Sequence, residues 1–178
     1  MFDPTAFDNM KVVIEGALYD FDLSGEIIIT DRNDIINMAK MSRSFDLSFQ
    51  LPAGSVTARI EMESKLVNLA AELLPSSLPE KLAGSYVKLQ FFLKHLENAS
   101  DFQAIETIFL DIWGEKRKIT QYVEYNPLNK PRKIKNTIAI DFERIIGEEQ
   151  MDDLIEMTDF MVTTMEQLQA FMLAGNRG

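Results

Sequence analysis

The chain of 178 residues contains no cysteine and has a formal charge of −10 at pH 7. This length suits one domain, and the absence of cysteine excludes disulfides, thiol catalysis and thiolate metal sites. The acidic balance works against general nucleic-acid binding.

The first predicted element is a hairpin near the start of the chain. Residues 11–22 and 26–31 predict its two strands, because they contain β-branched runs and flank a Ser-Gly turn. The spacing of Met10, Ile14 and Leu18 also fits one face of a helix over the first of these segments. We prefer the strand, and the helix remains the alternative.

The next segments alternate between helix and strand patterns. Residues 33–42 predict a short helix with an aspartate cap. Apolar and polar residues alternate strictly over 44–51 and again over 58–62, which predicts two neighbouring strands. Residues 64–74 predict a second short helix, because their apolar side chains share one face and Pro75 ends the pattern.

Four strand-like segments and a long helix complete the chain. The strands are predicted over 86–95, 103–113, 118–125 and 136–143, and the helix over 148–174. Short turns rather than helical crossovers join the strands, which indicates an antiparallel sheet. We therefore predict a single domain, 1–178, of the α+β class. A mainly antiparallel, curved sheet packs on the long C-terminal helix, with two short inserted helices.

The predicted C-terminal helix has more apolar surface than one flat sheet can cover. Its apolar side chains span roughly 220°, whereas a helix that lies on a sheet needs a stripe of little more than 100°. A curved sheet, a second subunit or a hydrophobic ligand would each cover the surplus. The candidate interface or cavity residues are Met157, Phe160, Met161, Met165, Leu168, Phe171 and Met172.

A basic segment interrupts this acidic chain. Residues 116–135 hold seven of the 18 Lys and Arg residues and a single acid. A two-residue Gly114–Glu115 loop is predicted to start the segment as a hairpin, which pairs Trp113 with Lys116 and mixes aromatic and cationic side chains on one face. The candidate residues for binding an anion or a partner are Trp113, Lys116, Arg117, Lys118, Tyr122, Lys130, Arg132 and Lys133.

Several roles fit this basic segment. Aromatic and basic side chains together clamp single-stranded nucleic acid in some proteins, and the same surface suits a small anion or an acidic protein segment. Lysines on an edge strand also prevent unwanted pairing between sheets, and a basic loop neutralises acids elsewhere in an assembly.

No pattern in the chain predicts catalysis, a cofactor or a metal site. The single histidine, His95, has no recognisable catalytic partner nearby in sequence, and histidine-based metal coordination is limited to one ligand. Glycine-rich phosphate loops and the GxSxG nucleophile motif are absent. We therefore assign no catalytic, cofactor-binding or metal-binding residue.

The sequence also lacks signs of export or membrane insertion. No apolar run approaches the ~20 residues that a membrane helix needs. The opening residues, MFDPTAFDNM, have neither the basic nor the apolar region of a secretory signal. We expect a cytoplasmic protein without a membrane span.

Together these patterns favour a non-enzymatic binding module that self-associates as a homo-oligomer through the apolar surface of its last helix. The first alternative is an enzyme or carrier for a small anionic or hydrophobic ligand. The second is nucleic-acid binding through residues 113–135, against which the net charge argues.

Overall fold

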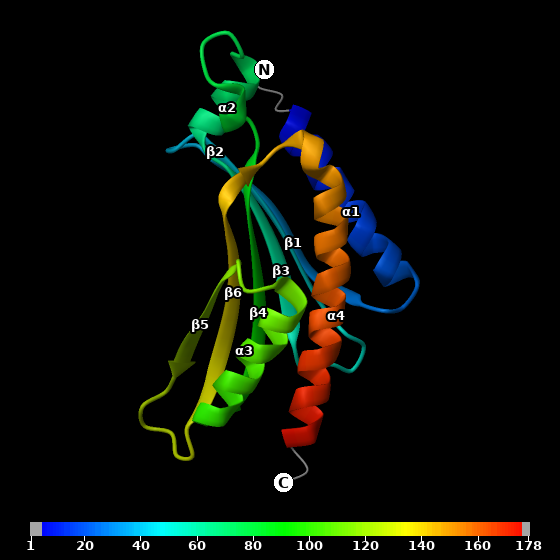
Figure 1. Ribbon diagram of the computed structural model, residues 1–178, viewed down its shortest axis with the longest axis vertical. Helices are drawn as coiled ribbons and strands as arrows, with labels where there is room; N and C mark the ends of the chain where they lie inside the picture. Colours follow the sequence, from blue (N-terminus) through cyan, green and yellow to red (C-terminus); the bar gives the residue numbers. More distant parts are fainter. Residues whose placement is uncertain (1–4, 176–178) are drawn as a thin grey trace.

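The computed structural model describes residues 5–175, which form a two-layer α+β domain (Figure 1). One layer is an open, six-stranded antiparallel sheet in the order β1-β2-β3-β4-β6-β5. The other layer contains the long C-terminal helix, so the predicted fold class is confirmed. The elements are α1 (Thr5–Leu23), β1 (Ile28–Asn37), β2 (Ser42–Gln50), β3 (Thr57–Ser64), α2 (Leu66–Leu73), η1 (Glu80–Leu82), β4 (Ser85–Leu96), α3 (Ala99–Trp113), β5 (Lys118–Tyr125), β6 (Lys133–Ile146), η2 (Glu148–Gln150) and α4 (Met151–Gly175).

Alternation in the central strands separates a core face of the sheet from an open face. On β2 and β3, Phe45 lies opposite Met62 and Leu47 opposite Ile60, and all four side chains are buried. Their polar neighbours in sequence point to the other face, as the pleat requires. The strands predicted at 44–51, 58–62, 86–95, 118–125 and 136–143 are confirmed, and so are the helices at 64–74 and 148–174.

The first predicted hairpin is wrong, because residues 5–23 form the helix α1. Only its second predicted strand, 26–31, overlaps an observed strand, β1. Met10, Ile14 and Leu18 are each 0% exposed and follow a four-residue spacing, so they form one buried stripe. The helical alternative from the sequence is therefore the correct one. The short helix predicted at 33–42 is also wrong, since residues 28–37 form the edge strand β1 and pair with β2 along their length.

The second hairpin prediction is wrong as well, because residues 99–113 form the helix α3. Its N-terminus is capped by Asn98, whose side-chain oxygen accepts a hydrogen bond from the Ser100 backbone N–H at 3.1 Å. Ile105, Phe109 and Trp113 recur every four residues and are buried against the sheet. The strand that follows, β5, pairs with β6 rather than with residues 103–113.

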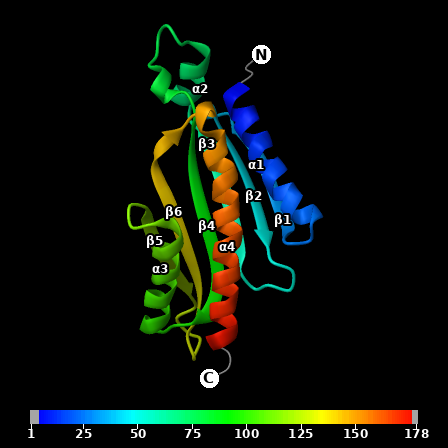
Figure 2. The ribbon, with the colours of Figure 1, turned by 45° about the vertical axis from the view of Figure 1, so that its right-hand side comes forward.

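Most of the wide apolar arc of α4 is covered by the chain itself, while Ile155 and Phe160 remain partly exposed. Helices α1 and α3 both contact α4, and Figure 2 shows the three helices across the same face of the sheet, with α4 between the other two. Met161, Met165 and Leu168 are completely buried, and Phe171 and Met172 are partly buried against the core. The segments that cover the arc are the two that the sequence analysis assigns to strands.

Ion pairs fasten α1 to the edge of the sheet. Asp34 on β1 accepts hydrogen bonds from Lys11 on α1 at 2.8 Å and from Arg43 on β2 at 3.0–3.1 Å. Arg43 also pairs with Asp8 of α1 at 2.9 Å, and its guanidinium lies over the Phe7 ring. The hydrogen bonds from Arg43, assisted by Lys11 and opposed by partial burial, lower the pKa of Asp34 to about 2.

This lowered pKa predicts a stability difference that depends on pH. We expect Asp34→Asn to lower the free energy of unfolding at pH 6 by about 1 kcal/mol, a value reduced for solvent screening of a partly exposed ion pair. The difference should shrink as pH falls from about 4 towards about 2, because the unfolded wild type then binds a proton at Asp34 whereas the folded ion pair keeps its charge down to about pH 2. Urea unfolding of the wild type and Asp34→Asn at pH 6 and pH 3 measures this difference in the free energy of unfolding. A difference that is equal at the two pH values would contradict the role of the ionised carboxylate.

A candidate ligand-binding cleft

The structure distributes the predicted anion-binding residues over three places. Trp113 and Arg117 lie on the helix side of the sheet, at the end of α3 and in the turn before β5. Lys118, Tyr122 and Lys133 occupy alternate positions on β5 and β6 that point to the open face. Lys116 lies exposed in the turn before β5, and Lys130 and Arg132 belong to the loop between β5 and β6.

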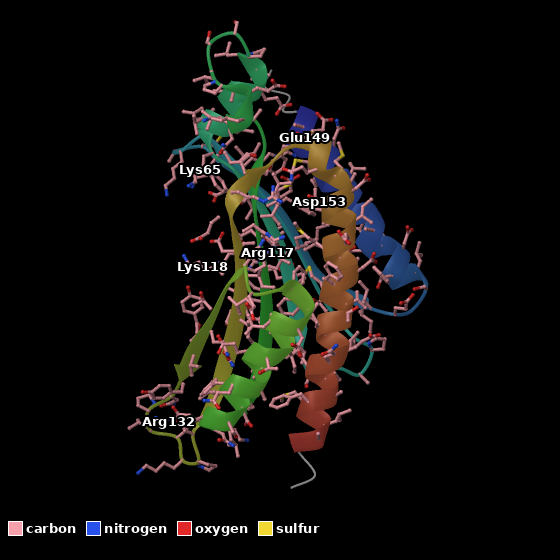
Figure 3. The ribbon with its side chains drawn as sticks, in the orientation of Figure 1. Lys65, Arg117, Lys118, Arg132, Glu149 and Asp153 are labelled. Atoms are coloured by element: carbon pink, nitrogen blue, oxygen red, sulfur yellow. The ribbon has the colours of Figure 1, made fainter. Side chains whose placement is uncertain are left out.

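These places are separated along the molecule. Strand β5 has eight residues, so its ends lie about 23 Å apart. Figure 3 shows Lys118 near the middle of the molecule and Arg132 at its lower end. At the upper end of β5, a 2.6 Å hydrogen bond to Glu143 raises the pKa of Lys118. At the other end, Arg132 pairs with Glu97 at 2.9 Å.

A cleft of about 150 Å³ brings together four residues from the two predicted sets. Trp113 and Arg117 come from the anion-binding set, and Met157 and Phe160 come from the apolar set on α4. The volume is close to that of a cavity that holds one aromatic ring. The complete lining is Ile112, Trp113, Arg117, Phe142, Arg144, Asp153, Glu156, Met157 and Phe160.

Three aromatic rings form the apolar wall of this cleft. The Trp113 ring packs edge-to-face against Phe160 at 5.6 Å and against Phe142 at 6.5 Å between centroids. The Trp113 indole N–H donates a hydrogen bond to the Thr164 Oγ1 at 3.0 Å, and this hydroxyl donates to the Phe160 backbone oxygen at 2.6 Å. Both hydrogen bonds hold the wall in one arrangement, so it is formed before any ligand arrives.

Arg117 supplies a positioned cation beside this wall. Its guanidinium lies over the Phe142 ring, with 5.0 Å between Cζ and the ring centroid. Stacking leaves the in-plane N–H donors of a guanidinium free, and their fork matches a carboxylate. Within residues 5–175, no acid forms an ion pair with Arg117. The cleft therefore contains an oriented cation that forms no ion pair with any acid among residues 5–175.

The other charged residues of the lining partly satisfy one another. Arg144 donates to the Gln150 side-chain oxygen at 3.1 Å and approaches Asp153 at 3.9 Å, and Gln150 in turn donates to Asp153 at 3.3 Å. Glu156 is exposed at the mouth and forms no ion pair within the described chain. Figure 3 locates Arg117 and Asp153 in the region between β6 and α4.

An irregularity in β6 shapes the wall of the cleft that the sheet provides. Lys88 of β4 pairs with Asp141 and Tyr86 with Ile145, so three β6 residues, 142–144, stand opposite one β4 residue. Glu143 has a φ of 51°, which is uncommon for a residue other than glycine. Such bulges redirect side chains, and this one includes both Phe142 and Arg144 of the lining.

The single histidine lies away from this cleft. The His95 ring packs against Phe102 of α3 at 5.6 Å, its Nδ1 lies 2.9 Å from the Leu96 backbone oxygen, and its Nε2 lies 3.3 Å from the Asn136 amide nitrogen. No group of three or more metal-ligating side chains exists among residues 5–175. A second hollow of about 370 Å³ between η1 and η2 has no aromatic side chain in its lining, so it offers no comparable wall.

Five lining residues were missed by the sequence analysis. Two of the five, Ile112 and Phe142, belong to ordinary apolar patterns of a helix or strand. Nothing in the sequence distinguishes the others from a solvated surface or a core strand. The five are Ile112, Phe142, Arg144, Asp153 and Glu156.

The chain matches no protein-family model, no curated protein and no solved structure. Across the described residues, no helix has the length and apolar composition needed to cross a membrane. The geometry of the cleft is therefore the basis for assigning a function.

Proposed function

We propose that the protein is a binding module for a small ligand, or for the end of a larger one, that carries an aromatic ring next to a carboxylate. The observation that supports this most directly is Arg117, which stacks on Phe142 beside the aromatic wall and has no acid partner in the described part of the chain. The ring would lie against Trp113 and Phe160, and the carboxylate would accept two hydrogen bonds from Arg117. This proposal develops the first alternative from the sequence analysis, an enzyme or carrier for a small anionic or hydrophobic ligand, as a binding module.

The single tryptophan makes this proposal testable by fluorescence. We expect phenylacetate to change the emission of Trp113 saturably, because the probe supplies both the ring and the carboxylate. Arg117→Gln should weaken its binding by about tenfold to a hundredfold, the usual effect of losing hydrogen bonds to a charged group. Fluorescence titration of both proteins measures the two dissociation constants.

Matched probes and a matched variant distinguish this proposal from binding that depends on the ring alone or on the negative charge alone. Benzylamine has the ring and the opposite charge, and acetate has the carboxylate alone, so both should bind more weakly than phenylacetate. Lys116→Gln removes a cation next to Arg117 in sequence but outside the lining, and it should leave the phenylacetate constant unchanged. Equal binding of benzylamine and phenylacetate, or equal constants for Arg117→Gln and the wild type, would refute the proposal.

A further inference from the structure

The face of the sheet opposite the helices has a concentrated positive corner. No helix within residues 5–175 covers this face (Figures 1 and 2). Lys94 of β4 lies directly opposite Lys135 of β6, and Lys133 points to the same face two residues along. Lys130 and Arg132 of the adjoining loop complete what we call the basic corner: Lys94, Lys130, Arg132, Lys133 and Lys135.

The basic corner is only partly neutralised within the chain. Lys135 approaches Glu124 of β5 at 3.8 Å, and Arg132 pairs with Glu97. Lys94, Lys130 and Lys133 form no ion pair within the described chain. Like charges directly opposite each other destabilise a sheet, so Lys94 and Lys135 oppose folding slightly unless an external acid approaches them.

Exposed apolar side chains border this corner. Tyr122 of β5 is 58% exposed and Leu128 of the β5–β6 loop is 89% exposed, and Leu96 at the end of β4 is half exposed. Lysines that only keep an edge soluble do not require such neighbours, whereas interfaces combine apolar contacts with charged groups at their margin. The corner thus has the composition of a docking surface for an acidic partner.

The helix layer of the same protein carries the matching charge. Helices α1, α3 and α4 contain twelve acids and one base, so their formal charge is −11, while the remaining residues together carry +1. Asp152, Glu156, Asp159 and Glu166 are exposed on α4 at spacings of four, three and seven residues, which places them in one stripe. Ile155 and Phe160, both partly exposed, flank this acidic stripe.

We propose that the basic corner of one copy of the chain docks on the acidic stripe of α4 in a second copy. The two surfaces have opposite charge, and each offers exposed apolar side chains to the other. Because they are different surfaces of the same molecule, the contact is head-to-tail and leaves one corner and one stripe unoccupied in a pair. Further copies add to those free surfaces, so the assembly grows with concentration. This inference does not rest on the ligand proposed for the cleft, although Glu156 of the stripe and Phe160 beside it also line the cleft.

Sedimentation velocity over a concentration series tests the contact. At 50 mM salt the weight-average mass of the wild type should rise above that of a monomer, and at 500 mM salt the rise should disappear, because screening shortens the range of the charges about threefold. Lys94→Gln with Lys135→Gln, and separately Asp159→Asn with Glu166→Asn, should each weaken self-association at least tenfold. The two acids lie outside the lining of the cleft.

A mixture of the two double variants gives the most specific result. One variant retains its stripe and the other retains its corner, so an equimolar mixture should form one-to-one pairs that do not grow further. Lys40→Gln with Lys81→Gln removes the same charge far from the corner in sequence and should associate like the wild type. Thermal unfolding of each variant checks that it remains folded.

Three outcomes would overturn this proposal. The wild type could remain monomeric at every concentration at 50 mM salt, or neither double variant could alter its association, or the mixture could form no pairs. Binding of a single-stranded oligonucleotide through Lys94 and Lys135 by a monomeric wild type would assign the corner to a polyanion instead.

Discussion

Alanine in place of Gly84 is expected to destabilise the protein by at least about 3 kcal/mol, because a side chain there meets backbone and a strained φ together. Gly84 precedes β4 with a φ of 141°. A Cβ at this position would lie 2.4 Å from the Ile146 backbone oxygen and 2.8 Å from the Ile145 Cγ2. The Ser64 hydroxyl of β3 donates a hydrogen bond to the Gly84 oxygen at 2.9 Å, and this bond fixes the position of the segment beside β3. Urea unfolding measures the loss.

The same substitution at Gly16 provides the control. Gly16 lies within α1, and a Cβ there would meet nothing within 4 Å. Gly16→Ala should therefore stabilise the protein by about 0.5–1 kcal/mol, since alanine favours the helical conformation more than glycine does. If Gly84→Ala costs no more stability than Gly16→Ala, residue 84 does not pack closely on the end of β6.

The clearest of the correctly predicted strands, β2 and β3, have one buried and one more polar face. Phe45, Leu47 and Phe49 alternate with polar residues on β2, and a shift of one residue would place all three in water. This requirement acts within a short window, so the pattern is visible without knowledge of the partner strand. The same reasoning explains the confirmed segment on β3, where Ala58, Ile60 and Met62 are buried.

The segments that the sequence analysis assigns wrongly carry two patterns at once. Residues 11–14, KVVI, favour a strand locally because they include β-branched side chains. Ile14 also belongs to a helical stripe, and packing of that stripe in the helix layer is what selects the helix. Gly114, taken as a hairpin turn, ends α3 with a φ of 80° and a backbone hydrogen bond to Leu110. A glycine with positive φ fits both a hairpin turn and the C-terminus of a helix, so the residue alone does not distinguish the two structures. Tertiary packing determines which one forms.

The cleft could be predicted only in part, because its walls come from segments that meet through the fold. Trp113 and Arg117 are close in sequence and both belong to the predicted anion-binding set, but Trp113 was expected on a hairpin strand and not at the end of a helix. Phe142 and Asp153 reach the same place from the β6 bulge and the start of α4. No local pattern relates these residues, since their proximity depends on the position of α3 over β5 and β6.

Ile14→Ala is expected to lower the free energy of unfolding by about 3 kcal/mol, as for other large-to-small substitutions in a packed core. Ile14 is 0% exposed on α1, the helix that covers one side of α4. Val12→Ala is the matched control, because Val12 is 61% exposed on the same helix and should change stability by at most about 0.5 kcal/mol. Urea unfolding of the wild type and both variants measures the difference. Equal losses for the two variants would mean that α1 does not bury its Met10–Ile14–Leu18 stripe, and the apolar arc of α4 would then require a cover from another molecule.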